Sequence, residues 1–162
     1  NRVSFYRMLN KITTIPGCNK ENIDKETFDN WVKNVVSVAQ RKMNVKETYC
    51  SLGTLLSYSP NGDDDIFPHQ VIRDFFEENM HDSKISEFLV PNFITGKINQ
   101  QGMVANWGSV EAAEENMANK YNCDANTIRI DYPETASILR RLRDHYTWSS
   151  KNLMDTDEWY FD

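Results

Sequence analysis

The stretch DKETFDNWVKNVVSVAQRKM (residues 24–43) decides the fold, because its large apolar side chains recur at steps of three and four residues. That spacing places them on one face of an α-helix and leaves most charged residues on the other face. Asp24 is a typical N-cap, since its carboxylate can accept hydrogen bonds from the free amides of the first turn. The apolar stripe consists of Phe28, Trp31, Val32, Val35, Val36, Ala39 and Met43.

The same pattern predicts helices further along the chain. A shorter helix is expected within residues 48–58, and a strong one over residues 68–80 with Pro68 as its first residue. A carboxylate of Asp64 or Asp65 is expected to cap that helix. A long helix is expected to open at Pro133. The buried stripes of these helices are Leu52, Leu55 and Leu56, then Val71, Ile72, Phe75, Phe76 and Met80, and then Ala136, Ile138, Leu139, Leu142 and Tyr146.

Two further helices lie between these. One begins near Ser83 and meets Pro91, which either kinks it or divides it. The other is capped by Ser109 and is expected to end at Asn119 or Tyr121. Residues 127–132 alternate in polarity, but the stretch is too short and has no partner, so we do not expect a strand.

Together these segments predict an all-α fold: a single compact domain of about six or seven helices over residues 1–162, packed as an irregular helical bundle. No repeat of fixed period is present, so a regular solenoid is disfavoured. The acidic and aromatic tail, residues 155–162, is expected either to dock on the domain or to fray. Because the first residue is Asn rather than Met, we expect the domain to belong to a longer protein.

Composition excludes several classes of function. The formal net charge of -6 over 162 residues opposes binding to nucleic acid, whose affinity for proteins begins with Lys and Arg. No apolar run approaches the roughly 18 residues that a membrane helix needs. The three cysteines are odd in number and far apart, which favours a reducing cytoplasm with buried or idle thiols.

Two motifs are candidate metal sites. Glu78 and His81 have the spacing of a di-iron motif, but a second such motif is absent, so a hydrated polar helix end is the preferred interpretation. The acidic loop at residues 61–65 lacks the Gly and Glu positions of a calcium-binding loop. The sequence therefore predicts no metal and no other cofactor.

Charged and aromatic clusters can likewise be interpreted as binding sites or as ordinary structural features. Arg140, Arg141 and Arg143 could contact an anion, but we expect them to pair with acidic neighbours. Arg73 and Asp74 are expected to form local ion pairs. Trp31, Trp107 and Trp148 are expected in the core or as wedges between helices, rather than as platforms for a ligand. Three consecutive aromatic residues cannot all face one core, so the best candidate for a partner surface is Trp159, Tyr160 and Phe161.

Three motifs follow one another along the chain: Ile23-Asp24 with Trp31 after it, Pro68-His-Gln-Val-Ile-Arg73-Asp74, and Tyr132-Pro133-Glu-Thr-Ala-Ser-Ile-Leu-Arg-Arg-Leu. This succession resembles a helical accessory domain found in C-terminal segments of large uncharacterised bacterial proteins. The resemblance covers residues 14 to 155. It implies an accessory domain without an assigned activity, and it transfers no functional residue.

The first hypothesis is therefore a non-catalytic helical interaction or structural module of a larger bacterial cytoplasmic protein. Its partners would be other domains of that protein or a separate protein. The alternative is a small-molecule-binding or hydrolytic domain with a pocket between helices. In that case Glu78, His81 and the arginines at 140, 141 and 143 would be the polar groups of the site.

Overall fold

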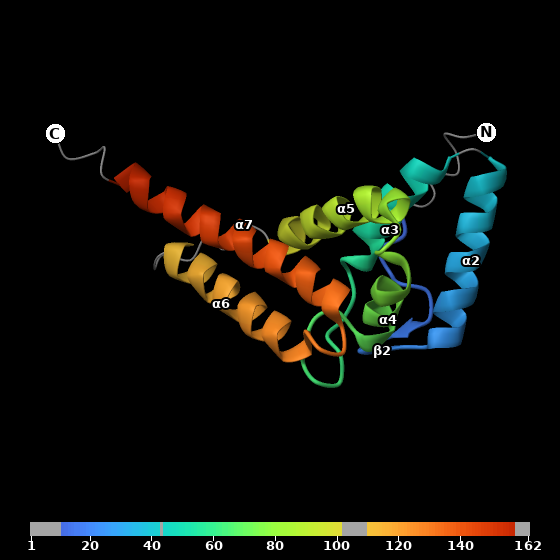
Figure 1. Ribbon diagram of the computed structural model, residues 1–162, viewed down its shortest axis with the longest axis horizontal. Coiled ribbons are helices and arrows are strands. Elements are labelled where there is room, and N and C mark those ends of the chain that lie inside the picture. Colours follow the sequence, from blue (N-terminus) through green and yellow to red (C-terminus); the bar gives the residue numbers. More distant parts are fainter. Residues whose placement is uncertain (1–10, 43, 102–109, 158–162) are drawn as a thin grey trace. The chain divides into compact units, whose positions relative to one another are not determined.

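Helices dominate the computed structural model, which describes residues 11–42, 44–101 and 110–157 and, within them, the side chains of all but residues 101, 110, 111 and 153–157. These residues form six α-helices and one short β-hairpin, so the predicted all-α class is confirmed (Figure 1). They divide into two compact units, Asn1–Asn99 and Gln100–Asp162. That residues 1–162 behave as one domain stays a prediction. The elements are β1 (Cys18–Asn19), β2 (Asn22–Ile23), α2 (Lys25–Arg41), α3 (Val45–Leu56), α4 (Gln70–Asn79), α5 (Ser83–Gln101), α6 (Val110–Ile128) and α7 (Pro133–Asp157).

The described part of the first unit leads through a β-hairpin into α2. Strands β1 and β2 pair antiparallel, with Cys18 opposite Ile23. Gly17 has a φ of 84°, and a Cβ there would lie 2.8 Å from the carbonyl oxygen of Asp24, so this position requires glycine. Asp24 caps α2 as predicted, because its Oδ1 accepts from the Thr27 amide at 2.8 Å. The hairpin was not predicted, because two residues per strand are too few to show a period.

Aromatic rings form the centre of the first unit's core. Phe28 of α2 meets Phe75 of α4 edge to face, with ring centroids 5.9 Å apart. Phe76 of α4 meets Phe93 of α5 in the same way at 5.0 Å. Phe67, in the loop before α4, stacks on Phe93 at 5.6 Å. The predicted stripe of α4 is buried throughout, as are Phe28, Val32, Val35 and Ala39 of α2, whereas Trp31 is half-buried.

Helices α3 and α5 approach each other through two glycines. A Cβ on Gly53 of α3 would collide with the carbonyl oxygen of Leu89 and would lie 3.1 Å from Cβ of Asn92. A Cβ on Gly96 of α5 would lie 2.5 Å from Oγ of Ser57, the residue that follows α3. The contact therefore brings one helix backbone directly against the other. Leu52, Leu55 and Leu56 of α3 are buried, as their spacing predicts.

Two predictions about proline in this unit are settled by the structure. Helix α5 continues through Pro91, so the proline does not divide it. Pro68 is not the first residue of α4, which begins at Gln70 with His69 as its N-cap. The expectation that Asp64 or Asp65 caps α4 is wrong, because an imidazole nitrogen takes that role.

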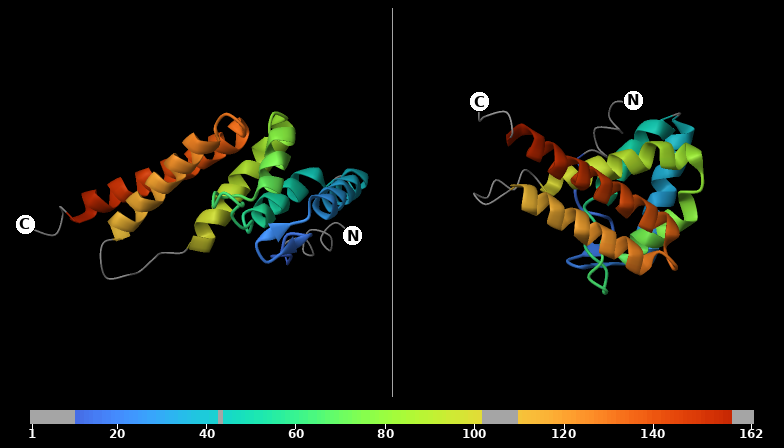
Figure 2. Two further views of the ribbon diagram at one scale, coloured as in Figure 1. Left: turned by 90° about the horizontal axis from the view of Figure 1, so that it is seen from below. Right: turned by 60° about the vertical axis from the view of Figure 1, so that its left-hand side comes forward.

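The second unit is an antiparallel helical hairpin of α6 and α7 (Figure 2). Tyr121 and Tyr146 stack between the two helices with centroids 5.8 Å apart. Pro133 is the first residue of α7, as predicted. Helix α6 runs on to Ile128, past the predicted end at Asn119 or Tyr121. Trp148 of α7 is 67% exposed, so its predicted place in the core is wrong. The apolar residues of α7 expected inward are all buried: Ala136, Ile138, Leu139, Leu142 and Tyr146.

None of the helices in the described ranges is long and apolar enough to cross a bilayer.

Candidate functional site

The sequence-predicted polar residues of α4 do not form a site. Glu78, near the end of the helix, and His81, after it, are both exposed, which agrees with the preferred interpretation of a hydrated helix end. Among the residues that the structure describes, no group of three or more His, Cys, Asp or Glu side chains is placed to hold a metal ion. The prediction that no metal binds stays a prediction.

The arginines of α7 point to several faces of the helix. Arg141 is exposed, whereas Arg140 and Arg143 are half-buried. Arg143 donates from Nη2 to Oδ1 of Asp144 at 2.6 Å and from Nη1 to Oδ1 of Asn122 on α6 at 3.1 Å. Its acidic partner is thus Asp144, the next residue of its own helix, as expected of an arginine that pairs with an acidic neighbour. Arg143 in this way fastens α7 to α6.

The aromatic surface predicted at Trp159, Tyr160 and Phe161 lies outside the described residues, and so does Trp107. The exposed large apolar side chains that the structure does describe include Trp148 of α7 and Ile130, in the turn between α6 and α7. Ile130 is 83% exposed. Both lie in the second unit, so exposed apolar surface is present there independently of the tail.

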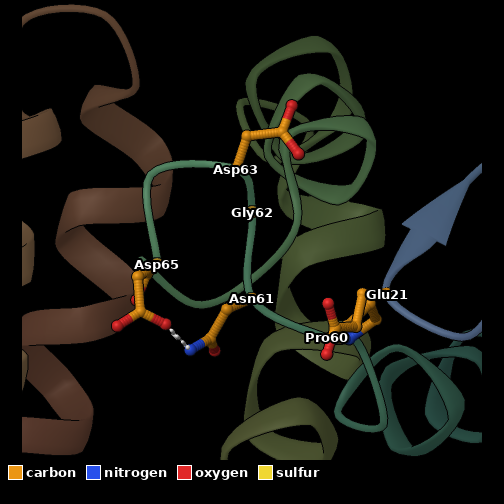
Figure 3. A pocket seen from close by; sticks show the side chains of 6 residues that line it. All are labelled: Glu21, Pro60, Asn61, Gly62, Asp63 and Asp65. Atoms are coloured by element: carbon orange, nitrogen blue, oxygen red, sulfur yellow. Dashed lines mark hydrogen bonds between the residues drawn. The ribbon is translucent and has the colours of Figure 1, made fainter.

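The best-organised polar arrangement lies in the first unit, in the segment between α3 and α4, residues 59–69, called here the 59–69 loop. Its ends are joined because the His69 amide donates to Oγ of Ser59 at 3.0 Å. Its middle closes on itself, since the Gly62 amide donates to the Ile66 carbonyl oxygen at 2.9 Å. The side-chain nitrogen of Asn61 donates to Oδ1 of Asp65 at 2.9 Å (Figure 3). A surface loop with joined ends and internal contacts has the features of an Ω-loop.

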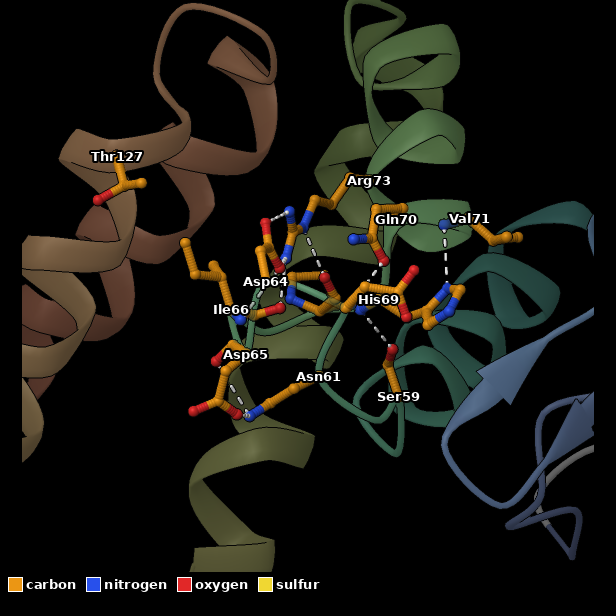
Figure 4. Close-up of polar contacts among 12 residues, drawn as sticks. Ser59, Asn61, Asp64, Asp65, Ile66, His69, Gln70, Val71, Arg73 and Thr127 are labelled. Carbon is orange, nitrogen blue, oxygen red and sulfur yellow. Dashed lines mark hydrogen bonds and ion pairs between the residues drawn. The ribbon is translucent and has the colours of Figure 1, made fainter.

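Arg73 of α4 binds this loop with a side chain that is only 1% exposed. Its Nη1 and Nη2 donate to the two carboxylate oxygens of Asp64 at 2.6 and 2.8 Å (Figure 4). Its Nε donates to the carbonyl oxygen of Pro68 at 2.6 Å, and Nη2 also donates to that of Ile66. These contacts are called here the Arg73 clasp. The clasp satisfies a buried guanidinium with the protein's own oxygens, as a buried charge requires.

The two residues predicted to form ion pairs therefore do so, but their partners lie at least nine residues away in the sequence. Arg73 pairs with Asp64, and Asp74 lies 3.8 Å from Nζ of Lys25 at the start of α2. The guanidinium of Arg73 holds the pKa of Asp64 below its ordinary value, chiefly by hydrogen bonding. The clasp was missed as a unit because Asp64 lies in a loop, where no helical period relates it to Arg73.

His69 is buried and caps α4 with its ring. Nδ1 accepts from the amide of Val71 at 3.2 Å. A nitrogen that accepts carries no proton, so the proton of neutral His69 is on Nε2. Burial lowers the pKa of His69, and the positive charge of Arg73 acts in the same direction, while Asp63, Asp64 and Asp74 oppose them. The capping role of His69 has no local signature in the sequence, and sequence analysis therefore missed it.

A polar hollow of about 570 Å³ adjoins the loop. It is lined by Glu21, in the turn between β1 and β2, and by Pro60, Asn61, Gly62, Asp63 and Asp65 (Figure 3). Its size is within the range of ligand pockets, about 300–1,000 Å³, but such pockets are mostly apolar, and this lining carries three carboxylates. The residues predicted for a site between helices, such as Glu78 and His81, are not among those that line it.

The buried state of His69 predicts how the stability of the first unit depends on pH. As the pH falls below about 6.5, the unfolded chain binds a proton at this side chain before the folded chain does. The free energy of unfolding should therefore be highest above that pH and should decrease as the pH falls below it. The decrease should end once the pH is below the pKa of His69 in the folded state. The lowered pKa of Asp64 adds a second decline only below about pH 4.

Urea unfolding between pH 8 and pH 5, followed by circular dichroism, measures this decline. Asn is a good N-cap that does not titrate, so His69→Asn should flatten the dependence in this range. His81→Gln is the matched control, since His81 is exposed, and should keep the wild-type slope. Equal slopes for wild type and His69→Asn would contradict the assignment.

Comparisons of the chain with family models, with curated proteins and with solved structures give no match. We therefore infer its function from the residues and contacts described above.

Proposed function

We propose that the chain is a non-catalytic helical interaction module of a larger bacterial cytoplasmic protein, and that it binds another part of that protein. The observation that carries the proposal is the exposure of Trp148, 67% of whose surface is open to solvent on α7. Tryptophan is among the residues that contribute most to the affinity of protein interfaces. The aromatic residues at 159–161 follow it closely in the sequence.

The best-organised polar groups support the same proposal. The guanidinium of Arg73 is directed at Asp64 and at backbone oxygens, and the ring of His69 caps α4. These side chains stabilise the protein itself, so they are not presented to a substrate. The bacterial origin follows from the resemblance described for residues 14 to 155. Free thiols at Cys18, Cys50 and Cys123 agree with a reducing compartment.

The proposal predicts the effect of Trp148→Ala. We expect its binding to the flanking segments of the parent polypeptide, produced separately, to weaken by about 30-fold, which corresponds to about 2 kcal/mol. Stability should change by less than about 0.5 kcal/mol, because the side chain is exposed. Titration calorimetry measures the first quantity, and urea unfolding measures the second.

Tyr58→Ala provides the matched control, since Tyr58 is a 43% exposed aromatic residue of the first unit, and it should bind as wild type does. Two results would overturn the proposal: a reading frame that encodes no residue beyond these 162, or flanking segments that bind wild type and Trp148→Ala equally. Retention on DNA that weakens with salt would instead identify a nucleic-acid-binding protein.

A further inference from the structure

Asn61–Gly62 is the one Asn-Gly pair in the sequence, and it lies in the 59–69 loop with Asn61 exposed and Gly62 half-buried. In such a pair the glycine has no side chain to shield its backbone nitrogen. That nitrogen can attack the amide carbon of the preceding asparagine side chain. The pair is thus the position in this chain that is chemically most open to spontaneous deamidation.

We infer that Asn61–Gly62 is a latent deamidation site that the Arg73 clasp keeps unreactive. In the reaction, the nitrogen of Gly62 bonds to Cγ of Asn61, and the bond from Cγ to Nδ2 breaks. Nδ2 leaves as ammonia and takes the proton that the Gly62 nitrogen loses. Water then opens the cyclic imide at either carbonyl and leaves aspartate or isoaspartate at position 61. Nothing is oxidised or reduced.

The packing of the loop explains why glycine follows Asn61. A Cβ on Gly62 would lie 2.6 Å from Cδ of Gln70, which is too close for two carbon atoms. The side chain of Gln70 is itself held, because its Oε1 accepts from the amide of Asp63 at 3.3 Å. A larger residue at position 62 would therefore displace the side chain of Gln70 and break its contact with Asp63.

Hydrogen bonds within the loop oppose the reaction. The attacking nitrogen of Gly62 already donates to the Ile66 carbonyl oxygen at 2.9 Å. The leaving nitrogen of Asn61 donates to the backbone oxygen of Asp65 at 3.2 Å and to its Oδ1 at 2.9 Å (Figure 3). Attack requires Gly62 to release Ile66 and the Asn61 side chain to turn back toward its own backbone. Both movements break loop contacts.

The clasp fixes the acceptors of these bonds. Ile66 accepts from Gly62 and also from Nη2 of Arg73, so one carbonyl joins the reactive pair to the buried guanidinium (Figure 4). Asp64, which precedes the other acceptor, is held by two hydrogen bonds from Arg73. Release of the clasp therefore frees Ile66 and Asp65 together. Deamidation would also prevent this loop contact from re-forming, because a carboxylate at position 61 would face Asp65 where a donor had been.

The test compares deamidation rates at position 61 by peptide mass spectrometry, with antibody-independent detection of isoaspartate, at mildly alkaline pH. The wild-type protein should deamidate about ten-fold or more slowly in buffer than in guanidinium chloride. The ratio of the two rates reflects the small fraction of native molecules in which the loop is open. Asp64→Ala removes the two carboxylate bonds of the clasp and should lose most of this protection. Asp63→Ala, one residue away and outside the clasp, should keep it. Asn61→Gln should show neither the native nor the denatured rate of deamidation at position 61.

Circular dichroism establishes whether Asp64→Ala is folded under these conditions. If it is folded and reacts as slowly as wild type, the clasp does not protect the pair and the inference fails. If it does not fold, the wild-type comparison decides alone: equal rates in buffer and in guanidinium chloride overturn the inference, and a slower native rate supports it. Asn19 and Asn22, which lack a following glycine, serve as internal references in every sample.

Discussion

Arg73→Ala is expected to lower the free energy of unfolding by about 3–5 kcal/mol, the usual cost of breaking a buried ion pair. The substitution leaves the carbonyl oxygens of Ile66 and Pro68 without the donors that Arg73 supplies, and it removes a large side chain that is 1% exposed. Asp64 can be rehydrated, because 41% of its side chain is open to solvent. Typical domains have only about 5–15 kcal/mol of stability, so the variant should be close to unfolding at physiological temperature.

Urea unfolding followed by far-ultraviolet circular dichroism measures this loss. Arg73→Lys should lie between wild type and Arg73→Ala, since one ammonium retains the charge but cannot reproduce the forked contacts of a guanidinium. Arg141→Ala, an exposed arginine of α7, should change stability by less than about 0.5 kcal/mol. A loss below about 1 kcal/mol for Arg73→Ala would place the clasp among ordinary surface pairs.

Phe93→Ala is expected to have an effect of similar size, about 3–5 kcal/mol. Phe93 is fully buried in α5 and contacts the rings of both Phe76 and Phe67. Its removal therefore leaves a cavity where α4, α5 and the 59–69 loop meet. The loss should appear in both thermal and urea unfolding.

Phe88→Ala tests whether burial is the cause. Phe88 lies on the same helix but is only half-buried, with Nζ of Lys46 5.0 Å from its ring centre. That contact contributes about 0.5–1 kcal/mol, so its variant should be much milder than Phe93→Ala. Equal losses for the two variants would show that Phe93 does not occupy the centre of this core.

The parts of the fold that could be predicted are those with local physical causes. Helix α2 follows from a stripe of apolar residues and from Asp24, which bonds to an amide three residues away. The start of α7 follows from Pro133, whose ring suits the first position of a helix. In both cases every residue that matters lies within one turn or one helix of the others.

What could not be predicted depends on contacts between segments. Pro68 has the composition of a helix start, but the chain needs its carbonyl oxygen for Arg73, and His69 takes the cap instead. Trp148 lies two residues beyond Tyr146, off the buried stripe of α7, so its large apolar side chain alone does not place it in the core. The candidate site at Glu78 and His81 followed from a spacing alone, and spacing cannot show whether a third ligand approaches.

The glycine contact between α3 and α5 has a consequence for how this protein can vary over evolutionary time. Side chains at most helix interfaces can be exchanged in compensating pairs, but no partner can yield room when the obstacle is a main-chain oxygen, as it is opposite Gly53. Gly96 is confined in turn by Ser57. We therefore expect divergent homologues to keep glycine at both positions after most of their surface has changed, which would make this pair a signature by which distant members can be recognised.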